Sequence, residues 1–483
     1  MNKSVVIGVD VGGTFTDVFA LDEATGKVTV AKVPSTKGDQ SAGFLEGITA
    51  ATDDLQAVST IIHGTTVATN ALLERKGAKA GIITTAGFRD VLEMRRRDRP
   101  TTWGLWGQFT PVVERQSRLE VAERTLADGT IVKAVDGEDI VKAAQQLLDQ
   151  GCESVCLFFI NGYANTTNET NAAKALRAVW PNEYVSVATE ILPEIREFER
   201  CSTATLNAYL QPVVANYLAR LENRIADEKS DAEILIVQSN GGVMSVQTAK
   251  SLPVRTALSG PAAGVVAARQ IAGAAGFNNV ITGDMGGTSF DVSLIADGQN
   301  MLTAQASIDF GMVVRTPMIE MSTIGAGGGS IAHIDDTGLL EIGPQSAGSD
   351  PGPVCYGLGN AQPTVTDANL VLGRIDARNP IGDKKKALDI DAAVEAIKTQ
   401  IAVPLKLGVY DAAEAIIKVA NAKMAGAIRL VSIERGHDPK QFALMSFGGG
   451  GALHAGALMQ DIGLAAGIVP RYPGVNSALG CVM

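Results

Sequence analysis

Two short stretches of the sequence carry the same acidic, glycine-rich pattern. Residues 7–18 read IGVDVGGTFTDV and residues 281–292 read ITGDMGGTSFDV, so that D-x-G-G-T-x-x-D-V is common to both. The positions that recur with identical spacing are Asp10, Gly12, Gly13, Thr14, Asp17 and Val18 in the first copy, and Asp284, Gly286, Gly287, Thr288, Asp291 and Val292 in the second. The repetition predicts that one chemical task is performed twice by the same local structure.

The residue types in this pattern favour a site for phosphate and a divalent cation. Each copy lies between apolar runs of strand length, which predicts a β-hairpin with glycines at its tip. Glycines leave backbone N–H groups uncovered for phosphate oxygens, and the threonine hydroxyl adds a donor. A carboxylate would repel phosphate unless a cation lay between them, and Mg²⁺ is commonly held by one or two carboxylates plus phosphates. We therefore expect the two hairpins to grip a polyphosphate from both sides, with Asp10 and Asp284 around one Mg²⁺.

A third glycine-rich stretch supports this interpretation over the alternative that each copy is only a tight hairpin with a capping aspartate. Residues 446–458, SFGGGGALHAGAL, predict a strand, a glycine turn and the start of a helix. A helix N-terminus with free N–H groups suits an anion or a nucleotide. The dinucleotide spacing G-x-G-x-x-G fails at Leu453, and the absence of G-x-x-x-x-G-K-[ST] from the sequence excludes a P-loop enzyme.

The elements that must position these turns follow from hydrophobic periodicity. Short apolar runs such as AVSTIIHG, KAGIITT, ESVCLFFI and EYVSVAT predict buried strands, and they alternate with helical patterns such as GEDIVKAAQQLLDQG. This alternation predicts an α/β protein with mixed sheets flanked by helices. We expect a boundary near residue 200 and an ordered loop at a site over residues 322–363, which are rich in Gly, Pro and Ser.

Composition limits the possible partners. The chain has 483 residues, a net charge of −11 and a pI near 5.0, which argues against a nucleic-acid or anionic-membrane binder. Its apolar runs fall short of a membrane helix, its start shows no cleavable leader, and its five cysteines form no disulfide framework. We expect a cytoplasmic protein. Among the histidines, His63 and His454 are the better candidates for a functional role, against the alternative that both are structural.

Several motifs together resemble the hydantoinase A/oxoprolinase family, which has the actin-like ATPase fold. They include GVDVGGTFTDVFALDEATGKV, IIHGTTVATNALLERKGAKAGIITTAGFRDVLEM, SGPAAGVVAA, GDMGGTSFDVSLI, STIGAGGGSIA, PTVTDANLVLGR and FGGGGALHA, in order along nearly the whole chain. The resemblance implies duplicated ribonuclease H-like domains with mixed β-sheets flanked by helices and a nucleotide cleft between them. It places the first phosphate hairpin in residues 1–200, and the second hairpin and the adenosine loop in residues 201–483.

The activity that this resemblance implies is ATP-dependent hydrolysis of a cyclic amide or imide, of hydantoin or 5-oxoproline type, by phosphorylation of the carbonyl. The chain would be the nucleotide-binding subunit, acting with a hydantoinase B-type second subunit. Asp10 and Asp284 would be catalytic and would hold Mg²⁺. The remaining implied contacts to ATP are Gly12, Gly13, Thr14, Thr16, Gly286, Gly287 and Thr288 for the phosphates, and Gly448, Gly449, Gly450 and Gly451 for the nucleoside.

Two other functions remain open at the level of sequence. One is an ATP-dependent carboxylase subunit that acts on acetone or a related ketone, and the other is a non-enzymatic actin-like ATP switch. Family subunits usually continue beyond the motif YPGVNSALG into a further domain, whereas this sequence ends at Met483. The resemblance therefore implies that the usual further C-terminal domain is absent from this chain.

Overall fold

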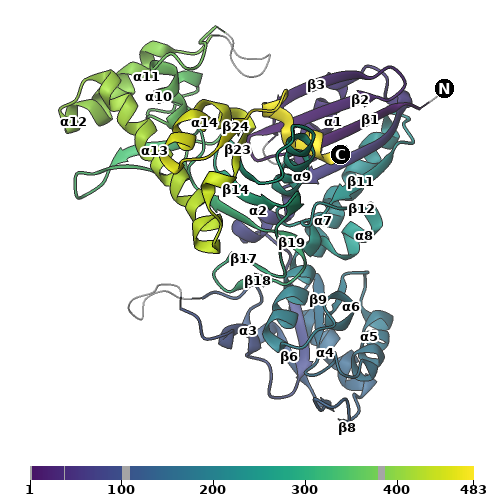
Figure 1. The fold of residues 1–483 in the computed structure, drawn as a ribbon. Coiled ribbons are helices and arrows are strands. Elements are labelled where there is room, and N and C mark those ends of the chain that lie inside the picture. The colour runs from purple at the N-terminus through teal and green to yellow at the C-terminus, as the bar shows by residue number, and fades with distance from the viewer. Residues whose placement is uncertain (1–2, 37–38, 100–108, 379–386) are drawn as a thin grey trace.

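A computed structural model describes residues 3–36, 39–99, 109–378 and 387–483. Two large mixed sheets lie in the upper part of Figure 1, and a smaller parallel-stranded module built from residues 80–191 lies below them. The long helix α7 (Glu197–Asp227) leads from this module back to the first sheet. The sequence-predicted α/β class with mixed sheets is confirmed.

The first sheet has the strand order β12-β11-β4-β1-β2-β3. Its strands are β1 (Val5–Val11), β2 (Phe15–Asp22), β3 (Lys27–Pro34), β4 (Val58–Thr65), β11 (Glu233–Val237) and β12 (Val243–Ser245). Its helices are α1 (Gln40–Ala51), α2 (Val67–Leu73), α7, α8 (Val246–Ser251) and α9 (Ser259–Ala274). Because β11 and β12 follow residue 200, this sheet takes strands from both sides of the expected boundary, and the division there stays a prediction.

The second large sheet is built from the second half of the chain. Its strands are β13 (Val280–Met285), β14 (Phe290–Ala296), β15 (Gln299–Asn300), β20 (Met321–Ile324), β23 (Ala443–Phe447) and β24 (Ala466–Ile468). On its side of the molecule lie α10 (Val365–Val371), α11 (Ile390–Ile397), α12 (Val403–Leu405), α13 (Val409–Val431) and α14 (Gly448–Ile462), whereas α15 (Asn476–Cys481) packs against α9 and the first sheet. The expected loop over 322–363 is partly regular, because β21 (Ser330–Ile334) pairs with β22 (Leu340–Ser346).

The two large sheets repeat one topology. β1 runs antiparallel to β2 and parallel to β4, as β13 runs antiparallel to β14 and parallel to β23. β3 and β20 extend the two hairpins in the antiparallel sense, and β11 and β24 extend the opposite side in parallel. The order β11-β4-β1-β2-β3 therefore corresponds to β24-β23-β13-β14-β20. In this correspondence α2, which follows β4, is the counterpart of α14, which follows β23.

The smaller module has the strand order β10-β9-β5-β6 and is inserted between α2 and α7. It contains β5 (Ala80–Thr85), β6 (Arg118–Val121), β9 (Ser154–Phe158), β10 (Val185–Val187), α3 (Val91–Met94), α4 (Gly137–Asp149), α5 (Thr167–Val179) and α6 (Ala188–Ile191). Short pairs complete the fold: β7 (Arg124–Thr125) with β8 (Ile131–Lys133), β16 (Leu302–Thr303) with β19 (Met318–Ile319), and β17 (Ala306–Asp309) with β18 (Met312–Val314). The strands predicted at AVSTIIHG, KAGIITT, ESVCLFFI and EYVSVAT correspond to β4, β5, β9 and β10.

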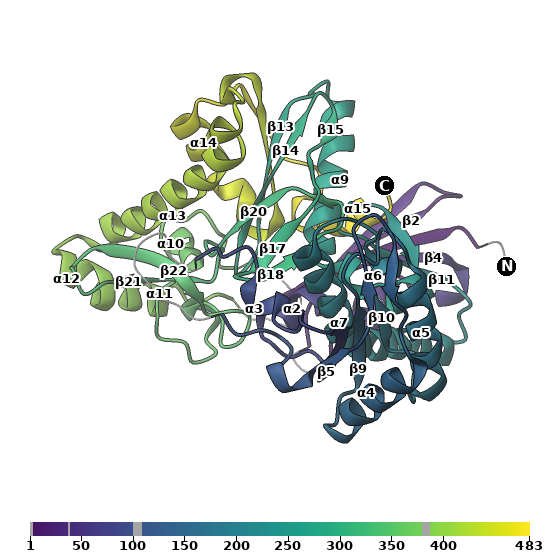
Figure 2. The ribbon, with the colours of Figure 1, turned by 90° about the horizontal axis from the view of Figure 1, so that it is seen from below.

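Helices α9 and α15 join the two halves. They lie side by side in both views, with α15 also against β1 (Figure 2). Small residues permit this close approach: a Cβ atom at Gly480 of α15 would overlap the carbonyl oxygen of Ala263 in α9. Asn476 adds a hydrogen bond from its side-chain amide to the carbonyl of Gly264, at 3.0 Å. The C-terminal helix α15, which follows the strands of the second half, therefore packs against the first hairpin and supports it.

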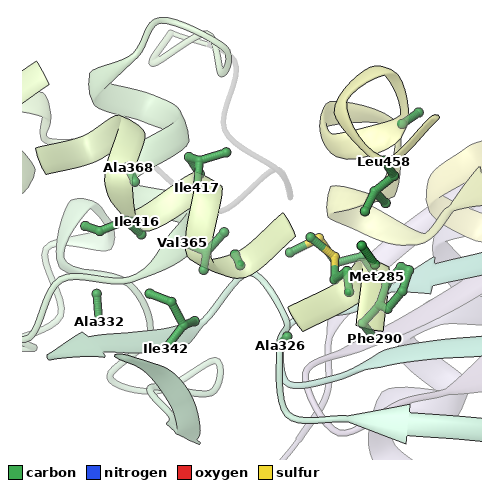
Figure 3. Packing of buried hydrophobic residues seen from close by; sticks show 14 of the residues in the cluster. Met285, Phe290, Ala326, Ala332, Ile342, Val365, Ala368, Ile416, Ile417 and Leu458 are labelled. Carbon is green, nitrogen blue, oxygen red and sulfur yellow. The ribbon is translucent and has the colours of Figure 1, made fainter. Parts of the chain in front are cut away.

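A hydrophobic cluster fixes the second hairpin. Figure 3 shows Met285 and Phe290, which flank the hairpin tip, near Leu458 of α14, and the cluster continues through Ile416 and Ile417 of α13. All these side chains are almost completely buried. Burial of this kind contributes roughly 1.5–3 kcal/mol per large apolar side chain, so the tip rests on a firmly packed base.

All five cysteines are buried. Among the described residues, no helix combines the length and the apolar character needed to cross a membrane.

The α9–α15 contact predicts a large difference between two glycine substitutions. Gly480→Ala forces a methyl group into the backbone of α9 and should lower the free energy of unfolding by about 1–3 kcal/mol. The control Gly273→Ala, also in α9, meets open space and should be neutral or slightly stabilising, because alanine favours helix. Urea unfolding of both variants checks this, and equal stabilities would contradict the proposed tight contact.

Candidate functional site

The tips of the two repeated hairpins meet at a cavity of about 420 Å³. A Cβ atom at Gly287 would lie 2.9 Å from the hydroxyl of Thr14, so the tips are in direct contact. From the first half, the lining residues are Asp10, Gly12, Gly13, Thr14, Phe15, Asp17, Lys32, Thr65, Thr66, Thr69, Asn70, Leu73, Leu258 and Pro261. From the second half, they include Asp284, Met285, Gly286, Gly287, Thr288, Asp291, Thr323, Gly328, Tyr356, Thr366, Asn369, Ile375, Gly448, Gly449, Gly450, Leu453 and His454.

Asp10 and Asp284 occupy equivalent positions on the two hairpins. Asp10 is the penultimate residue of β1 and pairs with Asp17, and Asp284 is the penultimate residue of β13 and pairs with Asp291. Glycines make room for both carboxylates, each near the start of a helix. A Cβ at Gly260 in α9 would lie 2.5 Å from Asp10 Oδ1, and one at Gly448, where φ is +80°, would overlap Asp284 Oδ1. Only glycine permits so close an approach between helix backbone and carboxylate.

The pKa values of both aspartates are raised. Burial raises the pKa of Asp10 to about 7, with a further contribution from the negative charge of Asp17. Burial also raises the pKa of Asp284 to about 8, and the charges of Asp291 and Asp10 act in the same direction. The charge of Asp10 thus acts on Asp284 across the two hairpins. Strongly shifted carboxyl groups in a cavity are typical of functional sites.

The second aspartate of each repeat has a different partner in the two halves. Asp17 forms an ion pair with Lys32, its cross-strand neighbour on β3, with 2.5 Å between Nζ and Oδ1. Asp291 instead accepts a hydrogen bond of 2.6 Å from the hydroxyl of Thr323, its cross-strand neighbour on β20. The backbone of the site is therefore repeated in the two halves, whereas the charges of the side chains around it differ. Lys32 is the one ammonium among the described residues that line the cavity.

A divalent cation fits between the paired aspartates. Asp10 Oδ1 is shielded from solvent and lacks a hydrogen-bond partner among the described residues, which is a costly state for a carboxylate oxygen. A cation bound there would compensate this charge and lower the pKa of both carboxyl groups. In the described part of the chain no three His, Cys, Asp or Glu side chains are arranged to hold a metal by themselves. The donor set thus suits Mg²⁺, which completes its shell with water and phosphate oxygens.

The glycines of residues 448–451 form the first turn of α14, where the sequence predicted a separate glycine turn before the helix. Phe447 precedes the helix without a side-chain cap, so the first N–H groups of α14 have no partner from a capping side chain. Beside this helix, the cavity wall includes Tyr356, Ile375 and Leu453. An apolar wall next to a helix N-terminus suits a base with phosphates attached.

Most predicted site residues line the cavity, and two do not. Thr16 points to the opposite face of β2, where its hydroxyl lies 3.2 Å from that of Ser35, because successive residues of a strand alternate sides. Gly451 is buried on the far side of the α14 turn, against the carbonyl of Gly283. Of the loop expected at a site over residues 322–363, Thr323, Gly328 and Tyr356 line the cavity.

The two candidate histidines differ in whether they line the cavity. His63 lies in the core, hydrogen-bonded to the carbonyl of Val9 and the hydroxyl of Tyr217, and does not line the cavity. His454 does line it, and its ring is held by Asn421 at 2.6 Å and Asn369 at 3.3 Å. Burial lowers the pKa of each to about 4, so both are neutral at physiological pH.

Sequence reasoning missed two groups of cavity residues. Lys32 and Thr323 join the site through cross-strand pairing, which the motif spacing does not encode. The polar residues of α2 entered only as part of a motif shared with the family. Their spacing carried a usable signal, because Thr66, Thr69 and Asn70 fall on one helical face.

The two repeated sheets and the cavity between them define a protein of the actin-like ATPase fold. Family models place it more closely: one for the hydantoinase/oxoprolinase N-terminal region matches residues 6–180, and one for hydantoinase/oxoprolinase matches residues 200–483. The chain belongs to the hydantoinase/oxoprolinase family.

Relatives in this family act on different substrates. Caprolactamase subunit alpha of Pseudomonas jessenii is 37% identical over 99% of this chain and 70% of its own length. The acetophenone carboxylase gamma subunit of Aromatoleum aromaticum is 35% identical over 98% of this chain and 67% of its own length. 5-Oxoprolinase 1 of Arabidopsis thaliana is 32% identical over 98% of this chain and 40% of its own length.

Two solved structures share the fold over 99% of this chain. The ATP-dependent caprolactamase of Pseudomonas jessenii is 36% identical, with a TM-score of 0.85 over 70% of its chain. An acetone carboxylase, described as performing ATP-dependent acetone carboxylation, is 29% identical, with a TM-score of 0.85 over 69% of its chain.

The raised pKa values predict how stability depends on pH without nucleotide. A carboxyl group whose pKa is raised on folding contributes its stability in full below its ordinary pKa, near 4, and that contribution is lost as pH rises through the folded value. For Asp284 the loss extends to about pH 8. At alkaline pH, Asp284→Asn should therefore unfold at a higher denaturant concentration than the wild type. Its free energy of unfolding should be higher by at least about 1 kcal/mol, after discounting for water in the cavity.

The control is Asp461→Asn, which removes an exposed carboxylate of α14. Its urea unfolding should follow the wild type between about pH 5 and pH 9. If the wild type and Asp284→Asn lost stability in parallel over this range, the pKa of the Asp284 carboxyl group would not be raised in the folded protein.

Proposed function

We propose that this chain is the nucleotide-binding subunit of an enzyme that hydrolyses a cyclic amide or imide, at the expense of ATP. The observation that carries the proposal is the pair of repeated hairpins, whose glycine tips touch and whose carboxylates, Asp10 and Asp284, face one cavity. The family relatives that act on cyclic amides, caprolactamase and 5-oxoprolinase, support the choice of substrate class.

ATP would lie across the cavity with its phosphates between the two tips. The backbone N–H groups at Gly12, Gly13, Gly286 and Gly287 and the hydroxyls of Thr14 and Thr288 are the expected phosphate donors. The nucleoside would lie beside α14, along Gly448, Gly449 and Gly450 and the apolar wall that contains Ile375 and Leu453. Mg²⁺, held by Asp10 and Asp284, would neutralise charge on the phosphates during transfer.

The proposed chemistry is phosphorylation of the amide carbonyl. The carbonyl oxygen attacks the γ-phosphorus, the bond to the bridging oxygen breaks, and ADP leaves. Water then adds to the activated carbon, and the C–N bond of the ring breaks to leave an amine and an acyl phosphate. A second water hydrolyses the acyl phosphate, which releases phosphate and the open-chain carboxylic acid. Phosphoryl transfer depends on positioning and charge neutralisation rather than on strong side-chain bases, which fits a site of N–H groups, hydroxyls and carboxylates.

A second subunit of the hydantoinase B type is the expected partner, because the related chains of caprolactamase, acetophenone carboxylase and acetone carboxylase are each one subunit of their enzyme. The carboxylase relatives also support a second candidate function, in which ATP activates a ketone for carboxylation. The TM-score of 0.85 to acetone carboxylase equals that to caprolactamase, so the fold favours neither.

Substrate-dependent ATP turnover tests these functions directly. The chain, alone and with its partner, should hydrolyse ATP faster in the presence of a hydantoin or a lactam. Loss of either metal-site carboxylate, in Asp10→Ala or Asp284→Ala, should reduce turnover by at least about a hundredfold. Stimulation by acetone plus bicarbonate instead would establish the carboxylase function, and ATP binding without stimulation by any of these compounds would indicate a switch.

Nucleotide binding should depend on Gly448 more than on other glycines of α14. Gly448→Ala places a methyl group against Asp284 Oδ1 at a residue with positive φ, which displaces the carboxylate. Calorimetry should show MgATP binding at least about tenfold weaker, because this substitution removes a contact worth more than 1.4 kcal/mol. Gly456→Ala, which meets open space on the same helix, is the control and should bind normally. Equal affinities would contradict the assignment of α14 to the nucleotide.

A further inference from the structure

The cavity has a second wall, formed by α2 and the start of α9, that the phosphate and nucleoside assignments leave unused. We refer to this surface as the α2 wall. Its residues are Thr65, Thr66, Thr69, Asn70, Leu73, Leu258 and Pro261. In the repeated topology α2 is the counterpart of α14, so the two helices flank the paired hairpins from opposite halves. With the nucleoside beside α14, a reactant that meets the γ-phosphate would lie beside α2.

The polar groups of the α2 wall are arranged on one helical face. Thr66, Thr69, Asn70 and Leu73 follow the spacing of one stripe along a helix. The Asn70 side chain donates one hydrogen bond to the Thr66 hydroxyl, at 3.3 Å. That bond uses one amide hydrogen and does not involve the Oδ1 acceptor. A carboxamide offers a donor and an acceptor side by side, which matches the C=O and N–H of a cyclic amide.

A strained residue supports the functional importance of this wall. Leu258 has φ +62° and ψ +26°, a left-handed conformation that is a genuine outlier for a leucine. Its backbone N–H is held by the Thr69 hydroxyl at 2.9 Å, which leaves the hydroxyl proton of Thr69 for another acceptor. Strain of this kind costs about 1–3 kcal/mol and clusters at ligand-binding positions. The strained backbone places the Leu258 side chain on the cavity lining beside Asn70.

Charge decides which substrates this wall accepts. None of the described residues on the α2 wall is ionisable. Elsewhere on the described lining there are four aspartates, and the one ammonium, Lys32, is already paired with Asp17. A substrate that carries a carboxylate would therefore lose its hydration and gain no cation, which is strongly unfavourable. The γ-phosphate of ATP would add further negative charge.

We propose that the α2 wall is the substrate subsite, and that it takes a small uncharged cyclic amide in preference to one that bears a carboxylate. The amide group pairs with Asn70 and the Thr69 hydroxyl. The ring carbons lie against Leu258 and Leu73. This assignment rests on the proposed function, since it takes the α14 side of the cavity as the nucleotide site.

The matched ligands for a test are 2-pyrrolidone and 5-oxoproline, which are the same five-membered lactam without and with a carboxylate. Binding of each is measured by calorimetry to the full chain with Mg²⁺ and a non-hydrolysable ATP analogue. We expect 2-pyrrolidone to bind at least about tenfold more tightly than 5-oxoproline. Because the assay requires no turnover, it reports on the subsite even if the proposed hydrolysis is wrong.

Asn70→Asp tests the pairing directly, because it removes the amide donor and adds a negative charge with almost no change in shape. It should weaken 2-pyrrolidone binding at least about tenfold. Asn171→Asp makes the same chemical change at an exposed position of α5, outside the cavity, and should bind both lactams as the wild type does. The lactams are titrated with the ATP analogue at saturation, and nucleotide affinity, measured separately, should stay unchanged in Asn171→Asp.

Leu73→Lys provides a second variant, in which the substituted side chain is exposed. The Leu73 side chain is 55% exposed at the cavity, so a lysine there is tolerated by the fold. The added ammonium should strengthen 5-oxoproline binding by at least about threefold, because it supplies the missing cation. Tighter binding of 5-oxoproline than of 2-pyrrolidone by the wild type, binding of neither lactam, or an unchanged affinity in Asn70→Asp would each overturn the proposal.

Discussion

Two carboxylates of like charge, Asp10 and Asp284, are held toward each other at the tips of two hairpins, and much of the structure serves to keep them there. Desolvation raises the pKa of both, Asp17 adds to the shift of Asp10, and Asp291 and Asp10 add to that of Asp284, so without a ligand the pair opposes folding. The close α9–α15 contact and the hydrophobic cluster behind the second hairpin stabilise the fold and offset the unfavourable burial of these carboxylates. A bound cation and polyphosphate would turn the repulsion into attraction, which links ligand binding to stability.

Duplication explains the geometry of the site, and asymmetry explains how its two halves can do different work. Equivalent strands deliver equivalent aspartates, yet Asp17 pairs with Lys32 whereas Asp291 bonds to the Thr323 hydroxyl. The helices that flank the tips also differ. α14 begins with glycines that expose backbone N–H groups, and α2 presents polar side chains beside the strained Leu258. A cleft of this kind can receive a nucleotide from one half and its acceptor from the other.

The sequence predicted the local structure of the hairpins well, because glycine and aspartate at fixed spacing encode a turn directly. It also led to the expectation that Asp10 and Asp284 face one site, since the repeat implied two related halves, and both line one cavity. It erred at Thr16, where strand alternation turns the side chain toward α1, and at the glycines of residues 448–451, which begin a helix. Lys32 could not be predicted from the motif, because its place in the cavity arises from the register in which β3 pairs with β2.

The most direct test of the shared metal site is a double-mutant cycle on Mg²⁺-dependent ATP binding, with Asp10→Asn, Asp284→Asn and the double variant measured by calorimetry. If both carboxylates act on one cation between the hairpin tips, each single substitution should weaken MgATP binding at least about tenfold. The double variant should then lose little more than either single one, with a coupling of about 1 kcal/mol or more. Losses that simply add, or Mg²⁺-dependent binding that persists in the double variant, would contradict a shared metal held by the repeated turns.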